Sequence, residues 1–170
     1  MTTKQNQPTI LITGATSGIG YAATKLLVGK GCNIVVHGKD RKTVRTICEE
    51  FNAESIITVW GDLSSLKQTS SLAEKIRKSA PTLDVVILNA GTFQKGGFLS
   101  ADGFELDFAV NYLSQLFLTH LLLSQSCLAP NARVIFVSSS AYINGKLDMD
   151  SFGKQYLNDP MMAYATSKQL

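Results

Sequence analysis

The chain has 170 residues, of which 45% are hydrophobic and 17% are charged, and its net charge is +3. This composition fits one globular domain over residues 1–170 and excludes an intrinsically disordered chain. The 16 basic and 13 acidic side chains are spread along the sequence, so charge gives no reason to expect nucleic acid or an anionic membrane surface as a partner.

Cysteines and apolar segments bear on where the protein works. Cys32, Cys48 and Cys127 are odd in number and lack metal-ligand spacing, so we expect reduced thiols and no metal site. The start, residues 1–8, is polar and has no apolar signal core. The apolar stretch at 110–128 is interrupted by polar residues such as Asn111 and Gln115, which favours a soluble helix. We therefore expect a cytoplasmic protein without a membrane anchor.

Predicted strands and helices alternate along the chain. Thr9–Ile12 is a short buried strand, and a helix follows from about Gly18 to Lys30 and ends at Gly31. In chain order there follow a strand at Asn33–His37, a helix from its N-cap Asp40 to Phe51, a strand at Ser55–Trp60, a helix from its N-cap Ser64 to just before Pro81, a strand at Leu83–Leu88, a helix at about Asp102–Leu128, a strand at Arg133–Ser138, and a helix that starts after Pro160. The strands are continuous apolar runs, which indicates a parallel sheet covered on both faces. The predicted fold class is a doubly wound, Rossmann-type α/β domain.

A glycine-rich turn follows the first strand, in the segment Thr13-Gly14-Ala15-Thr16-Ser17-Gly18-Ile19-Gly20. Binding a pyrophosphate requires a sharp turn, a close approach of the backbone, and the free N–H groups of a helix N-terminus. The strand-turn-helix context favours a dinucleotide site over a tight turn without a ligand.

The residues after the second strand decide between the two nicotinamide cofactors. An acidic residue there would hold a ribose 2′-hydroxyl, whereas basic residues accommodate a 2′-phosphate. Lys39 and Arg41 can face a phosphate, so we expect NADP(H), with NADPH favoured over NADH. A solvated charge cluster at a helix start remains an alternative for these residues.

Tyr164 and Lys168 lie four residues apart and share one face of a helix. A phenol has a pKa of about 10, and an ammonium about 4 Å away supplies interaction energy of the order needed to lower it toward neutrality. Tyr164 could then move a proton to or from a carbonyl oxygen while hydride moves to or from the cofactor. A second donor for the developing oxyanion could come from Ser138, Ser139 or Ser140, at the carboxyl end of the fifth strand.

The glycine turn, the serine-ended strand and the YxxxK pattern, in this order, resemble the short-chain dehydrogenase/reductase family. Asp62-Leu63 looks like the pair in that family that contacts adenine, and Leu88-Asn89-Ala90-Gly91 is similar to its NNAG segment. The resemblance implies Ser139 as the oxyanion donor, Tyr164 as the acid/base, Lys168 as the residue that lowers its pKa and holds the ribose, and Asn111 as the support of a water relay. It also implies cofactor contacts from Thr13, Gly14, Ser17, Gly18, Ile19, Gly20, Lys39, Arg41, Asp62, Leu63, Asn89, Ala90, Gly91, Tyr164 and Lys168.

The interval from Ser139 to Tyr164 looks like that of the retinol dehydrogenase and WW-domain oxidoreductase branch, which implies a lipophilic carbonyl or alcohol, such as a retinoid or a steroid, as substrate. In that family the helix with YxxxK continues and is followed by further strands and a substrate-binding segment. We therefore expect a C-terminally truncated sheet.

Two hypotheses remain open on this ground. The chain is a piece of an NADP-dependent reductase, or it is a short product that binds nucleotide or a partner and turns over little. The apolar stripe of the helix at 102–128 resembles the one that the family uses for dimerisation, which implies a homodimer; packing of that stripe against the sheet is the alternative.

Overall fold

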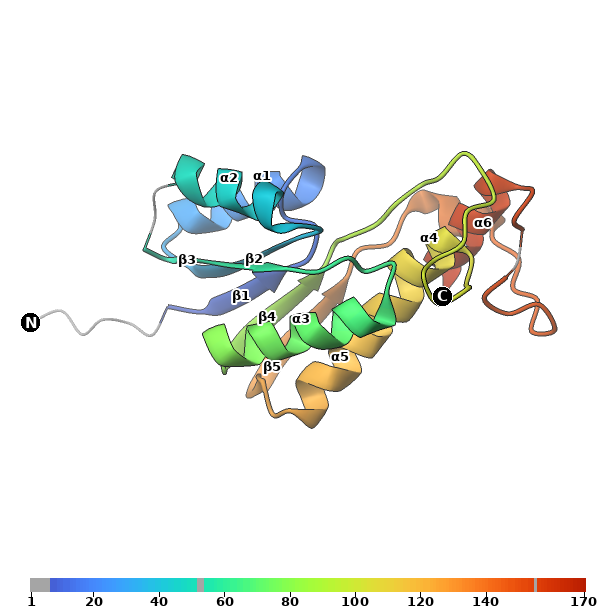
Figure 1. The fold of residues 1–170 in the computed structure, drawn as a ribbon. Coiled ribbons are helices and arrows are strands. Elements are labelled where there is room, and N and C mark those ends of the chain that lie inside the picture. The colour runs from blue at the N-terminus through green and yellow to red at the C-terminus, as the bar shows by residue number, and fades with distance from the viewer. Residues whose placement is uncertain (1–6, 52–53, 155) are drawn as a thin grey trace, which may run out of the picture.

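The computed structural model describes residues 7–51, 54–154 and 156–170. Its centre is one parallel sheet with the strand order β3-β2-β1-β4-β5 (Figure 1). The strands are β1 (Thr9–Ile12), β2 (Asn33–Gly38), β3 (Ile56–Trp60), β4 (Leu83–Leu88) and β5 (Leu128–Phe136). The helices are α1 (Gly18–Gly29), α2 (Arg41–Phe51), α3 (Leu66–Ser79), α4 (Leu106–Phe108), the π-helix η1 (Ala109–Leu113), α5 (Ser114–Ser124), the 3-10 helix η2 (Ser140–Asn144) and α6 (Pro160–Gln169).

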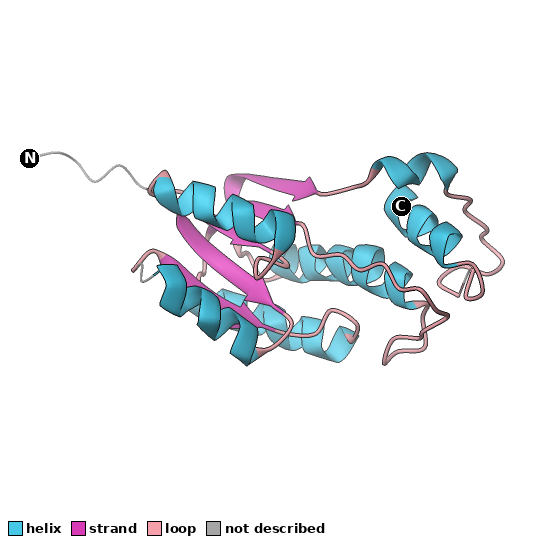
Figure 2. Ribbon diagram, turned by 90° about the horizontal axis from the view of Figure 1, so that it is seen from above, coloured by secondary structure: helices cyan, strands magenta, loops and turns pink. Residues whose placement is uncertain are grey.

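Two apolar layers hold the sheet between its helices. Ile10, Ile12, Ile34 and Val36 point to the face that α1 and α2 cover, whereas the alternate residues of the strands pack with Leu72 and Ile76 of α3 and Leu118 and Leu122 of α5. Figures 1 and 2 show the helices on both sides of the sheet. The predicted doubly wound α/β fold is therefore confirmed.

The third predicted helix begins one residue later than expected. Ser65, not Ser64, is its N-cap, and its hydroxyl accepts the N–H of Gln68 at 3.4 Å. The Ser64 hydroxyl instead donates to the carboxylate of Asp62 at 2.8 Å. The prediction of Ser64 as the cap was wrong because two adjacent serines offer the same capping chemistry, and the neighbouring carboxylate decides between them.

The helix predicted over 102–128 spans only Leu106–Ser124, as α4, η1 and α5 in succession. The Asp102 carboxylate accepts the N–H of Leu66, the first residue of α3, at 2.7 Å. Asp102 therefore contacts the start of α3 and is not part of the long helix. Ser126 has a left-handed backbone, φ 56°, which ends the helix before Cys127. By length and composition alone, Leu106–Ser124 is the one described helical run that could cross a membrane, and 44% of its 18-residue window is buried inside the protein.

The last strand, β5, lies at an edge of the sheet and differs from its predicted bounds. Its pairing with β4 starts at Leu83–Leu128, shifts register before Val85–Arg133 and ends at Leu88–Phe136, so Ser138 lies beyond the strand. Ile135 and Phe136 are 44% and 55% exposed. The sheet thus ends on an edge strand with two partly exposed apolar side chains.

Candidate active site

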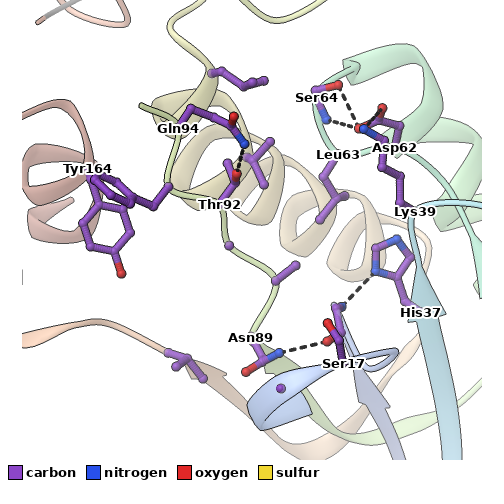
Figure 3. Close-up of a pocket in the computed structure, with 18 of the residues that line it drawn as sticks. Ser17, His37, Lys39, Asp62, Leu63, Ser64, Asn89, Thr92, Gln94 and Tyr164 are labelled. Carbon is purple, nitrogen blue, oxygen red and sulfur yellow. Dashed lines mark hydrogen bonds and ion pairs between the residues drawn. The ribbon is translucent and has the colours of Figure 1, made fainter. Parts of the chain in front are cut away.

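A cavity of about 860 Å³ opens at the carboxyl ends of the strands. It extends from the glycine turn after β1, past the residues after β2 and β3, to the segment after β4 and to α6 (Figure 3). The predicted site residues that line it are Gly14, Ser17, Gly18, Ile19, Lys39, Asp62, Leu63, Asn89, Ala90, Gly91, Tyr164 and Lys168. The fold thus brings the phosphate-binding turn and the Tyr164–Lys168 pair to one cavity.

The glycine turn is packed directly against the end of β4. Gly14 has a left-handed backbone, φ 62°, and a Cβ there would lie 2.8 Å from the Cα of Ala90. A Cβ on Gly20 would lie 2.3 Å from the carbonyl oxygen of Gly14. Ser17 is the N-cap of α1 but makes no side-chain capping bond, so the first N–H groups of α1 keep their donors for a ligand. This turn is a cradle that fits a phosphate.

Thr13 and Asn89 hold this turn in place. The Thr13 hydroxyl oxygen accepts the N–H groups of Asn89 and Ala90 at 3.0 and 2.9 Å. The Asn89 amide donates to the carbonyl oxygens of Thr13 and Gly14 at 3.0 and 3.2 Å. Both residues, predicted as cofactor contacts, therefore also fix the backbone that carries the phosphate-binding N–H groups.

His37, at the end of β2, clamps the glycine turn from the other side. Its Nδ1 accepts the N–H of Gly14 at 3.2 Å, and its Nε2 lies 2.9 Å from the carbonyl oxygen of Gly61, to which it donates (Figure 3). The ring is 2% exposed, and this burial lowers the pKa of His37 to about 4. The imidazole is therefore neutral, with its proton on Nε2. Sequence reasoning missed this residue, because its only signal is a histidine in an apolar strand.

The burial of His37 predicts a pH-dependent stability. An unfolded histidine titrates at about 6.5, so between pH 6.5 and 4 the unfolded chain binds a proton that the folded chain excludes. The His37 contribution is fully present above pH 6.5 and falls as the pH drops toward 4, by up to about 3 kcal/mol. In urea unfolding, the difference in free energy of unfolding between the wild type and His37→Gln should shrink as the pH falls from 6.5 to 4.

A difference that stays constant from pH 7 to 4 would contradict this account of His37. His120 lies exposed on α5 and supplies the control. His120→Gln is expected to keep the free energy of unfolding within about 0.5 kcal/mol of the wild type.

The two basic residues predicted for a 2′-phosphate lie in different surroundings. Lys39 lines the cavity, and its Nζ pairs with Asp62 Oδ2 at 3.1 Å. The Arg41 guanidinium lies over the ring of Trp60, 5.6 Å from its centroid, outside the cavity lining. Burial opposes ionisation of Asp62, but the hydrogen bonds from Ser64 and Lys39 prevail and hold the pKa of its carboxyl below the usual value. Of these two basic residues, Lys39 is the one that lines the cavity.

The reaction end of the cavity is formed by α6 and the segment after β4. The Lys168 ammonium donates to the carbonyl oxygen of Val137 at 3.2 Å and lies 6.0 Å from the centre of the Tyr164 ring. The Phe93 ring packs edge-on against Tyr164, with 5.3 Å between centroids. Burial lowers the pKa of Lys168. A Cβ on Gly91 would lie 3.1 Å from the Lys168 ammonium, so a side chain there would crowd the cation.

Asn111 lies behind this pair, in the π-helix η1. Its Oδ1 accepts the N–H of Thr92 at 2.7 Å, and its Nδ2 donates to the carbonyl oxygen of Thr92 and to the Ser167 hydroxyl, both at 2.9 Å. The side chain joins the segment after β4 to α6 next to Lys168. This placement is compatible with the predicted support of a relay, which stays a prediction.

Ser139 is not among the residues that line the cavity with Tyr164. Ser138 lines the cavity, and its hydroxyl donates to the carbonyl oxygen of Lys168 at 2.9 Å. The Ser139 hydroxyl accepts the N–H of Ala141 at 3.3 Å and caps η2. The role of Ser139 as oxyanion donor stays a prediction. No cluster of metal-ligating side chains is found among residues 7–51, 54–154 and 156–170.

Comparison with known proteins gives a consistent assignment. The family profile described as short chain dehydrogenase matches residues 8–169. The chain is 30% identical to retinol dehydrogenase 14 of Homo sapiens over 177 residues, covering 94% of this chain and 53% of that protein. It is 31% identical to the WW domain-containing oxidoreductase of Drosophila melanogaster over 172 residues, covering 94% of this chain and 42% of that protein.

A solved structure agrees with the sequence comparison. A protein from Mycobacterium paratuberculosis superimposes with a TM-score of 0.84 at 29% identity, and the match covers 95% of this chain and 57% of that one. The chain therefore spans about half the length of the proteins it matches. With its parallel sheet, its glycine turn and its Tyr164–Lys168 pair, the chain belongs to the short-chain dehydrogenase family.

Proposed function

We propose that the protein is an NADP(H)-dependent oxidoreductase that interconverts a carbonyl and an alcohol, with Tyr164 as the general acid/base. The observation that carries the proposal is the shared cavity, which has the glycine turn at one end and Tyr164 with Lys168 at the other. A Cβ at Gly14 or Gly20 would collide with the protein's own backbone, which fits the tight turn and close helix packing of a dinucleotide-binding turn, and a Cβ at Gly18 would meet nothing within 4 Å.

The residues divide the work along the cavity. The N–H groups at the start of α1 bind phosphate, and Lys39 faces the 2′-phosphate. The bound cofactor supplies the hydride. Tyr164 gives its phenolic proton to the carbonyl oxygen or takes one from the alcohol, and the Lys168 ammonium stabilises the phenolate. Ser139 donates the second hydrogen bond to the oxyanion.

Lys39 tests the cofactor assignment. The wild type should bind NADPH more tightly than NADH in a fluorescence titration, because only NADPH presents a 2′-phosphate to the ammonium. Lys39→Glu should weaken NADPH binding about tenfold or more, corresponding to about 1.4 kcal/mol per factor of ten. NADH binding should stay constant or tighten, because an acidic residue at this position can hold the ribose 2′-hydroxyl.

A matched charge reversal separates this contact from the overall charge of the protein. Lys42 is exposed in the first turn of α2 and lies outside the cavity lining. Lys42→Glu should therefore keep the NADPH preference. Equal affinities of the wild type for the two cofactors, or an unchanged preference in Lys39→Glu, would refute the assignment of Lys39.

We propose a lipophilic substrate and a cytoplasmic location for a single cofactor-binding domain. The similarity to retinol dehydrogenase 14, whose name denotes a lipophilic alcohol, supports the substrate class. Apolar side chains in the cavity lining, including Phe93, Phe98 and Leu99, support it as well.

We also propose a homodimer through α5. Leu116 and Leu123 are exposed on this helix, whereas Leu118 and Leu122 pack in the core.

A second candidate function is nucleotide or partner binding with weak turnover. The exposed Ile135 and Phe136 on β5 favour it, because in the described part of the chain no further strand pairs with β5 beside the Tyr164–Lys168 end of the cavity. NADPH binding without reduction of any carbonyl in a panel would support this candidate over the first.

A further inference from the structure

Asp107 is a buried carboxylate at the start of the helical run that carries Asn111. Its side chain is 0% exposed. Oδ2 accepts the N–H of Gln94 at 3.4 Å, and Oδ1 has no hydrogen-bond partner among the described residues. A buried acceptor left unpaired costs free energy of folding, on the order of 1–3 kcal/mol. Oδ1 therefore adds no hydrogen bond that stabilises the fold, and the hydrogen bond that Oδ2 accepts lies next to the Tyr164–Lys168 pair.

Asp107 and Asn111, one helical turn apart, hold both residues that flank Phe93. Asp107 accepts the N–H of Gln94, and Asn111 bonds both the N–H and the carbonyl oxygen of Thr92. A further bond, from Gln94 Nε2 to the Thr92 hydroxyl at 2.6 Å, closes the segment (Figure 3). Phe93, between them, packs edge-on against Tyr164. The two side chains thus fix the segment that supports the Tyr164 ring.

Three groups face the Asp107 carboxylate. Glu105, from the same segment, accepts the N–H groups of Asp107 and Phe108 at 3.0 and 2.7 Å. The segment after β4 offers the N–H of Gln94, and the Lys168 ammonium of α6, which packs against α4, acts on the carboxylate through its charge. Burial and the like charge of Glu105 raise the pKa of Asp107 to about 7. Burial lowers the pKa of Lys168, and the charge of Asp107 opposes that effect.

We propose that Asp107 is a positioning residue of the Tyr164–Lys168 site: it anchors the Gln94 end of the segment that packs Phe93 on Tyr164, and its buried carboxylate, on a helix packed against α6, acts through its charge on the Lys168 ammonium. Its importance for catalysis rests on the proposed function. The effect of the Asp107 charge on Lys168 is a property of the chain without any ligand, so it can be tested by itself.

The test is the titration of Lys168 in the 170-residue chain. Lysines labelled with ¹³C at Cε are followed by NMR from pH 7 to 11, with Lys168→Arg to assign the signal. Asp107→Asn keeps the shape and the acceptor but removes the charge, so the pKa of Lys168 should fall below its wild-type value. Asp84→Asn is the control: its carboxylate accepts the N–H of Thr9 at 2.8 Å, at the opposite end of the sheet. In that variant Lys168 should titrate as in the wild type.

A structural role alone would change the melting temperature of Asp107→Asn and leave the Lys168 titration unmoved, and that result overturns the proposal. If Asp107→Asn does not fold, the reciprocal measurement decides. The Asp107 carboxyl carbon is titrated in the wild type and in Lys168→Gln, where its pKa should rise; an unchanged value overturns the proposal. Failure of NADPH binding or of turnover would refute the proposed function and leave both NMR results valid.

Discussion

Gly20→Ala is expected to weaken NADPH binding by at least about 100-fold and to destabilise the fold by about 1–3 kcal/mol. The added Cβ would lie 2.3 Å from the carbonyl oxygen of Gly14 and 2.6 Å from Asn89 Nδ2. The Gly14 oxygen is a backbone atom, and Asn89 Nδ2, although it ends a side chain, is held by its hydrogen bonds to the carbonyl oxygens of Thr13 and Gly14. The backbone of the turn must therefore move, and its N–H groups no longer point toward the position of the phosphate. Fluorescence titration with NADPH and urea unfolding measure the two effects.

Gly29→Ala is the matched control for Gly20→Ala. Gly29 lies at the other end of α1, and a Cβ there has nothing within 4 Å. Alanine is a better helix former than glycine by up to about 1 kcal/mol, so the stability should stay constant or rise and NADPH binding should not change. Wild-type NADPH affinity in Gly20→Ala would show that the turn does not hold the cofactor.

Tyr164→Phe is expected to lower turnover at least about 100-fold while NADPH binding changes little. The substitution removes the phenolic proton donor but keeps the ring that packs against Phe93. Reduction of a panel of aldehydes and ketones, including a retinal and a steroid ketone, is followed by the loss of NADPH absorbance. A parallel NADPH titration separates lost chemistry from lost binding.

Tyr142→Phe is the control, since it removes a phenolic hydroxyl from a half-exposed ring on η2. That variant should turn over like the wild type. Activity that survives Tyr164→Phe would remove the acid/base role, whereas a wild-type chain that binds NADPH and reduces nothing would favour the second candidate function.

Local patterns carried most of the fold prediction. The strands are continuous apolar runs, and the glycine turn between β1 and α1 has a local signature, so both could be read from neighbouring residues. The ends of the long helix could not. Asp102 leaves it because its carboxylate meets Leu66, 36 residues away in sequence. Ser65 rather than Ser64 caps α3 because Asp62 takes the hydroxyl of Ser64.

The same reason explains which site residues were missed. His37 acts on Gly14 and Gly61, each more than 20 residues away, and Asp107 acts on Gln94 and on α6. Neither His37 nor Asp107 belongs to a sequence motif. The roles of both follow from their burial, which arises only when the sheet and the helices pack together. The family motif supplied Tyr164, Lys168 and Asn111 because their chemistry is tied to fixed spacings.

Two buried titratable groups give the fold opposite responses to pH. His37 stabilises less as the pH falls from 6.5 toward 4, because its folded pKa is depressed. Asp107 has a raised pKa, so its contribution is greatest below pH 3.8 and is lost as the pH rises through about 7. Over pH 4–6.5 the two trends oppose each other. Each single variant, His37→Gln or Asp107→Asn, therefore exposes the trend of the other residue.

The π-helix η1 makes the length of its segment matter more than its composition. The N–H of Ser114 bonds the carbonyl oxygen of Ala109, five residues back, so this run holds one residue more than an α-helix would. The wider turn absorbs the extra residue, so α4 and α5 keep nearly the relative orientation of one continuous α-helix. Asp107, which bonds Gln94, and Gln115, whose amide donates to Ala90 at 2.9 Å, therefore both face the segment after β4. Deleting one residue within η1 would restore regular α geometry with little rotation of α4, and the change would fall on the side chains of η1 itself, among them Asn111.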